Sequence, residues 1–311
     1  MTVSDLVRLI DEGPQVRCHW ALPCRRSVEK AGSMNTDAPI VVGYDGKPDS
    51  VAALSWAAEL ASLRGDALVA TTIVDPRETP RGTAWPESYW AEIADQAREV
   101  CAQWPQVSTR IERHTGHLVP RLVEAAREAS MLVVGSQGHG LVGEILRGSV
   151  SQGAARHATV PVVVVRAPDN PASGRIVVGA DGSDSSTRAL EFACDLARLT
   201  GDKIVALRAW HPAPVVTDRY GYVPPPRADT IDHAEAALGR MVDDVRVAHP
   251  DLAIEGEIFN GPAERGLVDA SSDASLVVVG SRGHAAVAEV LMGSVSKAVL
   301  HKAHSPVAVV H

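Results

Sequence analysis

Glycine, serine and histidine recur at fixed spacing in two stretches of the chain. "GSQGHGLVGEILRGSVS" begins at Gly135, and "GSRGHAAVAEVLMGSVS" begins at Gly280. Both follow the frame G-2x-G-9x-G-S after a short apolar run. Glycine lets a ligand approach the backbone closely, and a helix that begins after a Gly-Ser pair presents unpaired N–H donors and a partial positive charge. The frame therefore indicates a site that holds phosphate groups through the main chain.

Each stretch is preceded, much earlier in the chain, by an aspartate at the end of an apolar run. These are Asp45 in "GYDG" and Asp181 in "GADG". Ligands of doubly wound sheets bind at the carboxyl ends of strands, so these carboxylates are placed to meet a sugar or a phosphate-bound Mg²⁺. The alternative is that each aspartate only fixes the turn before the following helix.

Other chemistry finds little support in the sequence. Gly138–Gly143 match G-x-G-x-x-G, but the second copy lacks two of the three glycines, which favours an accidental match. There is no phosphate-binding G-x-x-x-x-G-K-[ST] motif, no zinc spacing and no G-x-S-x-G nucleophile motif. His139 and His284 follow the second glycine of each frame. Two interpretations are open: each histidine contacts phosphate, or each lies in a solvated loop. We predict no catalytic residues and no metal site made of protein ligands alone.

The two frames belong to a tandem repeat. "IVVGYDG" at Ile40 and "IVVGADG" at Ile176 are 136 residues apart, whereas the frames are 145 residues apart, so the second copy carries nine more residues. We place the extra residues in the Pro-rich stretch 211–230, which we expect to be a loop with no regular pattern.

Within each copy, apolar strands alternate with helical patterns. This alternation predicts an α/β protein of two tandem doubly wound domains, each a five-stranded parallel sheet flanked by helices. The helix after the first strand is expected to be capped by Asp49 or Ser50 and to end at Gly65. The predicted domains are residues 38–167 and 175–311, joined by a linker at 168–174.

Residues 1–37 match nothing in the repeat. We expect an N-terminal extension that is a disordered tail or follows from a translation start placed too early, since Met34 stands just before the first copy. A regulatory or redox role for Cys18 and Cys24 is the alternative. The four cysteines of the chain are scattered, which favours ordinary reduced thiols.

Composition narrows the class of partner. The chain has 311 residues, 45% of them hydrophobic and 22% charged, which suits a globular protein. Its net charge of -8 argues against nucleic acid and against an anionic membrane surface as partners. No apolar run approaches a membrane span of about 18 residues, and the first residues lack the apolar core of a signal peptide. We therefore expect a cytoplasmic protein.

In these motifs the chain resembles the universal stress protein family, in two tandem copies over about residues 38–311. The resemblance implies the strand order 3-2-1-4-5, an ATP-binding subclass, a role in stress, hypoxia or dormancy, and dimers joined through the last strand. In the first copy it implies nucleotide contacts from Asp45, Ile73, Val74, Gly135, Ser136, Gly138, His139, Gly148, Ser149, Val150 and Ser151. In the second copy it implies contacts from Asp181, Ala209, Trp210, Gly280, Ser281, Gly283, His284, Gly293, Ser294, Val295 and Ser296.

Three functions follow as hypotheses. The first is a sensor whose occupancy by ATP, alone or with Mg²⁺, regulates a stress response; the others are a slow ATPase of the same fold and a nucleotide-independent scaffold. The last apolar run of each copy, "VPVVVV" and "PVAVV", should form an edge strand that invites pairing. We expect the two halves to pair with each other, we leave open a further homodimer through the last strands, and the downstream protein partner is unknown.

Overall fold

The computed structural model describes residues 38–76, 86–136, 149–166, 174–211, 217–218, 221–222, 231–283 and 292–311. The predictions for the N-terminal extension, the linker and four frame residues (Gly138, His139, Gly148 and His284) lie outside the described residues. Within the described ranges, no helix is long and apolar enough to cross a membrane.

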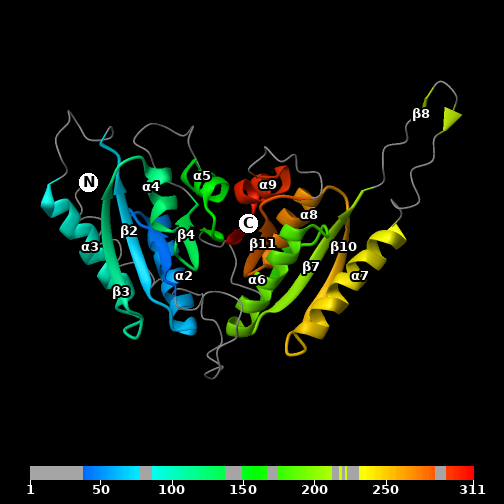
Figure 1. Ribbon diagram of the computed structural model, residues 1–311, viewed down its shortest axis with the longest axis horizontal. Helices are drawn as coiled ribbons and strands as arrows, with labels where there is room; N and C mark the ends of the chain where they lie inside the picture. Colours follow the sequence, from blue (N-terminus) through cyan, green and yellow to red (C-terminus); the bar gives the residue numbers. More distant parts are fainter. Residues whose placement is uncertain are drawn as a thin grey trace.

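Strands and helices alternate through both halves (Figure 1). The first half contains β1 (Ile40–Gly43), α2 (Pro48–Arg64), β2 (Leu68–Val74), α3 (Glu87–Cys101), β3 (Thr109–Thr115), α4 (Leu118–Ala125), β4 (Met131–Gly135), α5 (Ser149–His157) and β5 (Val162–Val165). The second half contains β6 (Arg175–Gly179), α6 (Asp184–Thr200), β7 (Lys203–Trp210), β8 (Thr217–Asp218), β9 (Gly221–Tyr222), α7 (Ile231–Ala248), β10 (Ile254–Asn260), α8 (Ala263–Ala270), the 3₁₀ turn η5 (Ser271–Asp273), β11 (Leu276–Gly280), α9 (Ser294–Lys302) and β12 (Val307–Val310).

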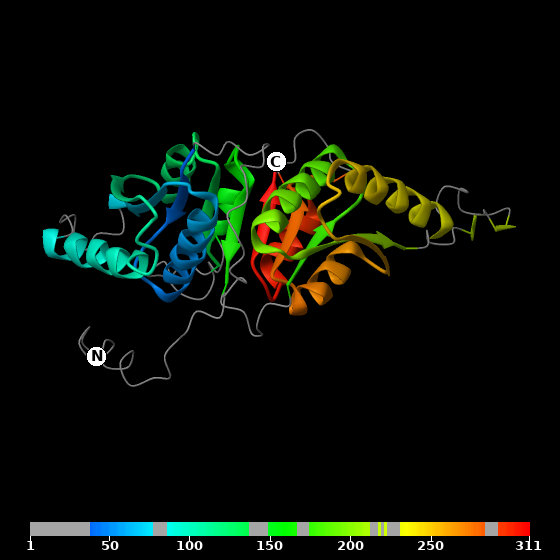
Figure 2. The same cartoon turned by 90° about the horizontal axis from the view of Figure 1, so that it is seen from below.

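The long strands form one ten-stranded sheet in the order β10-β7-β6-β11-β12-β5-β4-β1-β2-β3. Within each half the strands are parallel and follow the order 3-2-1-4-5, which confirms the predicted fold class. The halves join where β5 and β12 pair antiparallel, with Val163 opposite Ala308; the green and red strands at the centre of Figure 2 lie side by side there. Both last strands then have neighbours on each side. A further homodimer would therefore need a surface other than these two edges.

Helices cover both faces of the sheet (Figure 2). Residues of α2, α3, α6 and α7 pack on one face, and residues of α4, α5, α8 and α9 pack on the other. Strands covered on both sides bury every residue, which explains why β5 reads as an unbroken valine run.

The predicted start of α2 is wrong. The helix begins at Pro48 with Lys47 as its N-cap residue, and no side chain caps it. Proline suits the first helical position because its missing N–H would have no helical partner there. Ser50 instead donates its hydroxyl to the Lys47 carbonyl (2.9 Å) and accepts the Asp45 N–H (3.2 Å). The predicted end is confirmed, since Gly65 adopts a left-handed φ of 74°.

The Pro-rich stretch of the second copy is not wholly irregular. Within 211–230, the short strands β8 and β9 pair antiparallel, with Thr217 opposite Tyr222 and Asp218 opposite Gly221. They belong to a separate two-stranded sheet, and β8 lies beyond the outer strands of the main sheet (Figure 1).

Candidate functional site

The carboxyl ends of the central strands bring the predicted residues to one edge of the sheet. In the second half, β6 pairs with both β7 and β11 in parallel, so all three strands end on the same side. Asp181 follows β6 and Gly280 ends β11. The equivalent strands β1 and β4 place Asp45 and Gly135 at the same edge in the first half.

A cavity of about 460 Å³ lies at this edge of the second half. Eight of the predicted residues line it: Asp181, Ala209, Gly280, Gly283, Gly293, Ser294, Val295 and Ser296. Ser281 and Trp210 are not among its lining residues. Ser281 instead joins two elements through its backbone, because its N–H donates to the Val310 carbonyl (2.6 Å) and its carbonyl accepts the Gly293 N–H (2.8 Å).

The amino end of α9 opens into this cavity. Gly293 is the N-cap residue, with φ -69° and ψ 159°, and no side chain caps the helix. The Ser296 hydroxyl, which is within reach of the first turn, donates to the Gly280 carbonyl instead (2.6 Å). The first N–H groups of a helix have no partner inside it. An anion in the cavity would therefore meet the amides of this turn and the positive end of the helix dipole.

The three frame glycines of this half differ in how much room their surroundings leave for a side chain. A Cβ atom at Gly283 would lie 2.5 Å from Asp181 Oδ2, and one at Gly280 would lie 2.8 Å from the Ser185 carbonyl carbon. A Cβ at Gly293 would meet nothing closer than the Ser281 carbonyl oxygen at 3.6 Å. The packing of the protein itself therefore requires Gly280, whereas at Gly283 the close contact is with the end of one side chain and at Gly293 there is room for a Cβ atom.

Both strand-end aspartates fix turns. Asp181 Oδ1 accepts hydrogen bonds from the Ser183 N–H (2.9 Å) and the Ser183 hydroxyl (2.6 Å). Asp45 Oδ1 accepts the Lys47 N–H (3.2 Å), and its Oδ2 lies 3.0 Å from Lys47 Nζ. The turn-fixing alternative thus describes real contacts in both halves, while contact with a ligand stays a prediction.

The model of the family described as "Universal stress protein family" matches residues 38–166 and 173–311. The chain belongs to the universal stress protein family. Universal stress protein Rv1996 of Mycobacterium tuberculosis (strain ATCC 25618 / H37Rv) is 34% identical over 307 residues, covering 89% of this chain and 96% of that protein. Universal stress protein Rv2623 of the same strain is 33% identical over 296 residues, covering 89% and 97%.

A solved structure of a universal stress protein from Archaeoglobus fulgidus DSM 4304 shares the fold. It superposes with a TM-score of 0.63 at 20% identity, covering 88% of this chain and 97% of that one.

Two arginines of this family member were missed by the sequence reasoning. Arg208 and Arg282 both line the cavity, where Asp181 is the only carboxylate among the described lining residues. Arg208 interrupts the apolar run of β7 near its carboxyl end, at the position of Thr72 in the first half. Arginine is rare in buried strands, so its presence near the end of this one could have identified Arg208 as a candidate site residue. Arg282 stands inside the glycine frame, where the first copy has Gln137.

The first half of this universal stress protein keeps the same framework where it is described. A Cβ atom at Gly135 would lie 2.8 Å from the backbone of Asp49, and the Ser136 hydroxyl donates to Asp49 Oδ2 (3.0 Å). Ser149, Val150 and Ser151 begin α5, as predicted.

Four of the predicted nucleotide contacts, which the resemblance places next to the adenine, end the second strand of each half. Ile73 and Val74 end β2, and Ala209 and Trp210 end β7. The carbonyls of Val74 and Trp210 already accept backbone N–H groups, from Gly116 at 3.0 Å and Gly261 at 2.8 Å. A base contact there would have to use other atoms or share these carbonyls.

Proposed function

We propose that this universal stress protein binds ATP in each half and acts as a nucleotide-dependent sensor in a stress or dormancy response. The observation that carries the proposal is the amino end of α9. An uncapped helix start, preceded by a glycine that protein packing does not require, lines a cavity of about 460 Å³. That volume lies in the usual range for small-molecule sites, roughly 300–1,000 Å³.

The phosphate groups would be held mainly by the main chain. The amides of Ser294 and Val295 begin α9, and Gly283 allows the loop after β11 to pass close to Asp181. Arg208 and Arg282 add positive charge to a cavity lined by a single carboxylate among the described residues. This excess of cation suits a polyanionic ligand.

The adenosine end would lie toward β6 and β7. Ala209 is the predicted contact that lines the cavity there. Asp181, whose Oδ1 accepts two hydrogen bonds from Ser183, would contact the ribose or a Mg²⁺ ion carried by the phosphates. The proposal assigns the equivalent role to Asp45.

We further propose that hydrolysis is very slow or absent. Backbone donors hold phosphates in the ground state, whereas acceleration needs interactions that strengthen in the transition state and a positioned water. Asp181 is held by the turn, so it is poorly placed as a general base. A slow ATPase and a nucleotide-independent scaffold are the rival functions. Turnover near the ~10 s⁻¹ typical of enzymes would favour the ATPase if Asp45→Ala and Asp181→Ala together abolished it.

Titration calorimetry with ATP tests the proposal. The wild-type chain should bind close to two nucleotides. Gly293→Val should remove one, because its side chain fits the protein but enters the phosphate position. Gly148→Val should remove the other, and the double variant should bind none. Gly239→Ala is the control, since Gly239 is an exposed residue of α7 and a Cβ atom there would meet nothing within 4 Å.

Full binding by a folded double variant would refute the site assignment. Absence of nucleotide binding by the wild-type chain would favour the scaffold. The domain limits at 38–167 and 175–311, the cytoplasmic location and a further homodimer also stay proposals, because they rest on the sequence alone.

A further inference from the structure

One arginine of the first half reaches the phosphate-binding helix proposed for the second half. Arg166 directly follows β5. Its Nη2 donates to the Leu300 carbonyl and its Nη1 donates to the Ala303 carbonyl. Both carbonyls lie at the carboxyl end of α9, while the amino end of α9 lines the cavity. The two ends of a single helix thus face the proposed ligand and the other half of the protein.

The chemistry of this contact favours a fixed helix. The last carbonyls of a helix lack partners inside it and carry partial negative charge. A guanidinium that binds two of them makes charge-assisted hydrogen bonds in a fixed fork. Burial lowers the pKa of Arg166, while the nearby Asp49 carboxylate opposes that shift. Asp49 also accepts the Ser136 hydroxyl, so the same carboxylate contacts the loop after β4.

The residue at the equivalent position of the second half makes a different contact. The repeat places His311 at the position of Arg166. Burial lowers the pKa of His311, as do the neighbouring cations Arg282 and Arg188. Its Nε2 atom is buried without a hydrogen-bond partner among the described residues. A single imidazole of lowered pKa cannot replace a permanently charged fork, so the two halves do not exchange equivalent contacts.

We propose that Arg166 is a positioning residue for the second nucleotide site, supplied by the first half. It holds α9 so that the amides of Ser294 and Val295 are already oriented when phosphate arrives. Pre-ordering of binding groups raises affinity because less ordering remains to be done on binding. This inference rests on the proposed function. It adds that the second site depends on contact between the halves, through a residue that does not line the cavity.

Two single-site backgrounds test it. In a Gly148→Val chain only the second site would bind ATP, and in a Gly293→Val chain only the first would. Adding Arg166→Met should raise the Kd of the second site about tenfold, which corresponds to about 1.4 kcal/mol of binding free energy, because α9 loses two charge-assisted hydrogen bonds that fix it. The Kd of the first site should change less than twofold.

Hydrogen exchange provides a readout that needs no ligand. Arg166→Met should speed exchange of the α9 amides relative to those of α5. Arg246→Met is the matched control, because Arg246 Nε and Nη2 also donate to a carbonyl, that of Ile254, at 3.0 and 2.6 Å. Ile254 begins β10, at the opposite edge of the sheet from the cavity. The control should leave both Kd values and the α9 exchange unchanged.

Equal weakening of both sites by Arg166→Met, or an unchanged second site, would overturn the inference. Failure of both parent chains to bind ATP would instead count against the proposed function, and the α9 exchange would still decide whether Arg166 positions the helix. If Arg166→Met does not fold, Arg166→Lys carries the test. It keeps the charge but not the fork, so it should weaken the second site selectively; wild-type affinity at both sites would refute the inference.

Discussion

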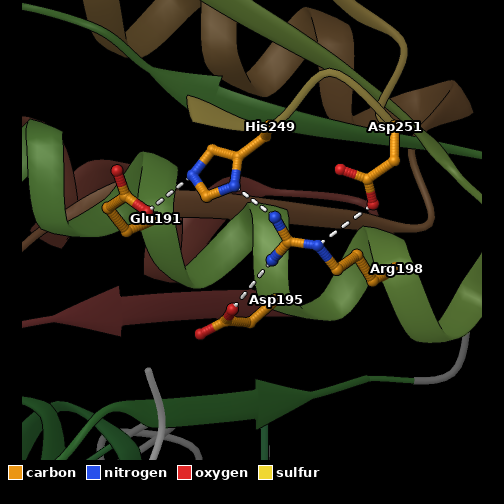
Figure 3. Close-up of polar contacts among 5 residues, drawn as sticks. All are labelled: Glu191, Asp195, Arg198, His249 and Asp251. Carbon is orange, nitrogen blue, oxygen red and sulfur yellow. Dashed lines mark hydrogen bonds and ion pairs between the residues drawn. The ribbon is translucent and has the colours of Figure 1, made fainter. Parts of the chain in front are cut away.

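At the edge of the sheet opposite the cavity, the second half carries a charged network of Glu191, Asp195, Arg198, His249 and Asp251 (Figure 3). Arg198 of α6 is its centre. Its Nε lies 3.2 Å from Asp251 Oδ2, its Nη1 lies 3.3 Å from Asp195 Oδ1, and its Nη2 contacts His249 Nδ1. The other ring nitrogen of His249 lies 2.9 Å from Glu191 Oε2. The network ties α6 to the turn between α7 and β10.

The equivalent positions of the first half are almost uncharged. They hold Ser55, Glu59, Ser62, Trp104 and Gln106. Gln106 Nε2 donates to the Ser62 hydroxyl (2.5 Å) and so joins α2 to the turn before β3, where Arg198 and Asp251 stand in the second half. At the positions of Arg198 and Asp251 the first half therefore makes this junction with neutral side chains, although a buried ion pair between Arg64 and Asp66 (2.9 Å) lies at the end of α2. The repeat preserves the fold through its apolar pattern, and the polar contacts around it are free to diverge.

The largest difference should appear when the network loses its cation. Arg198→Met removes the main cation beside Asp195, whose side chain is 10% exposed and which also lies near the Glu191 carboxylate. Burial already raises the pKa of Asp195, and Arg198 is the largest influence opposing that shift. We expect the free energy of unfolding in urea to fall by about 3 kcal/mol, the low end for a broken buried pair. Ser62→Ala, its counterpart, should cost about 0.5 kcal/mol or less. Equal losses would show that the charged network adds nothing over the neutral junction.

A second difference should appear at alkaline pH. Tyr44 is buried in the first half where the second half has Ala180, and burial, with a smaller contribution from Asp45, raises its pKa from 10.0 to about 12. A raised pKa means that the folded state favours the protonated phenol. Its contribution is fully present below pH 10 and is lost as the pH rises through about 12. Two pKa units correspond to about 2.5 kcal/mol.

The comparison of the wild-type chain with Tyr44→Phe isolates this contribution. Between pH 10 and 12, the free energy of unfolding of the wild type should fall by about 2 kcal/mol more than that of the variant. Below pH 9 the variant should be at least as stable, because the Tyr44 hydroxyl has no hydrogen-bond partner within the described residues. Parallel pH curves would contradict the burial of this phenol.

The smallest difference concerns the starts of α2 and α6. Ser183 caps α6 by accepting the Ser186 N–H (3.2 Å), whereas Lys47, at the same position of α2, makes no side-chain cap. Ser183→Ala should therefore lower the free energy of unfolding by about 1 kcal/mol. Lys47→Ala removes an exposed ion pair with Asp45 and should cost less than about 0.5 kcal/mol. Thermal unfolding of both variants measures the two losses of stability. A larger loss for Lys47→Ala than for Ser183→Ala would contradict the assignment of the helix cap to Ser183.

The sequence by itself determined the repeat, the fold class and the strand ends. Those features follow from local patterns: apolar runs between turns, helical periodicity, and glycines at strand and helix ends such as Gly65 and Gly280. The start of α2 was misplaced because Asp49 and Ser50 are good cap residues, while Pro48 competes for the first helical position. Local preferences of this kind decide a boundary only when they agree.

Contacts between distant residues were decided by the tertiary structure alone. Arg166 and the α9 carbonyls are more than 130 positions apart, and Arg198 and Asp251 are 53 apart. Arg208 faces the cavity only because β6, β7 and β11 end at one edge. A charged side chain in a sequence has many possible partners, and its pairing depends on which elements the packed core brings within a few ångströms. That placement follows from the burial of apolar residues throughout both halves, which no local stretch encodes.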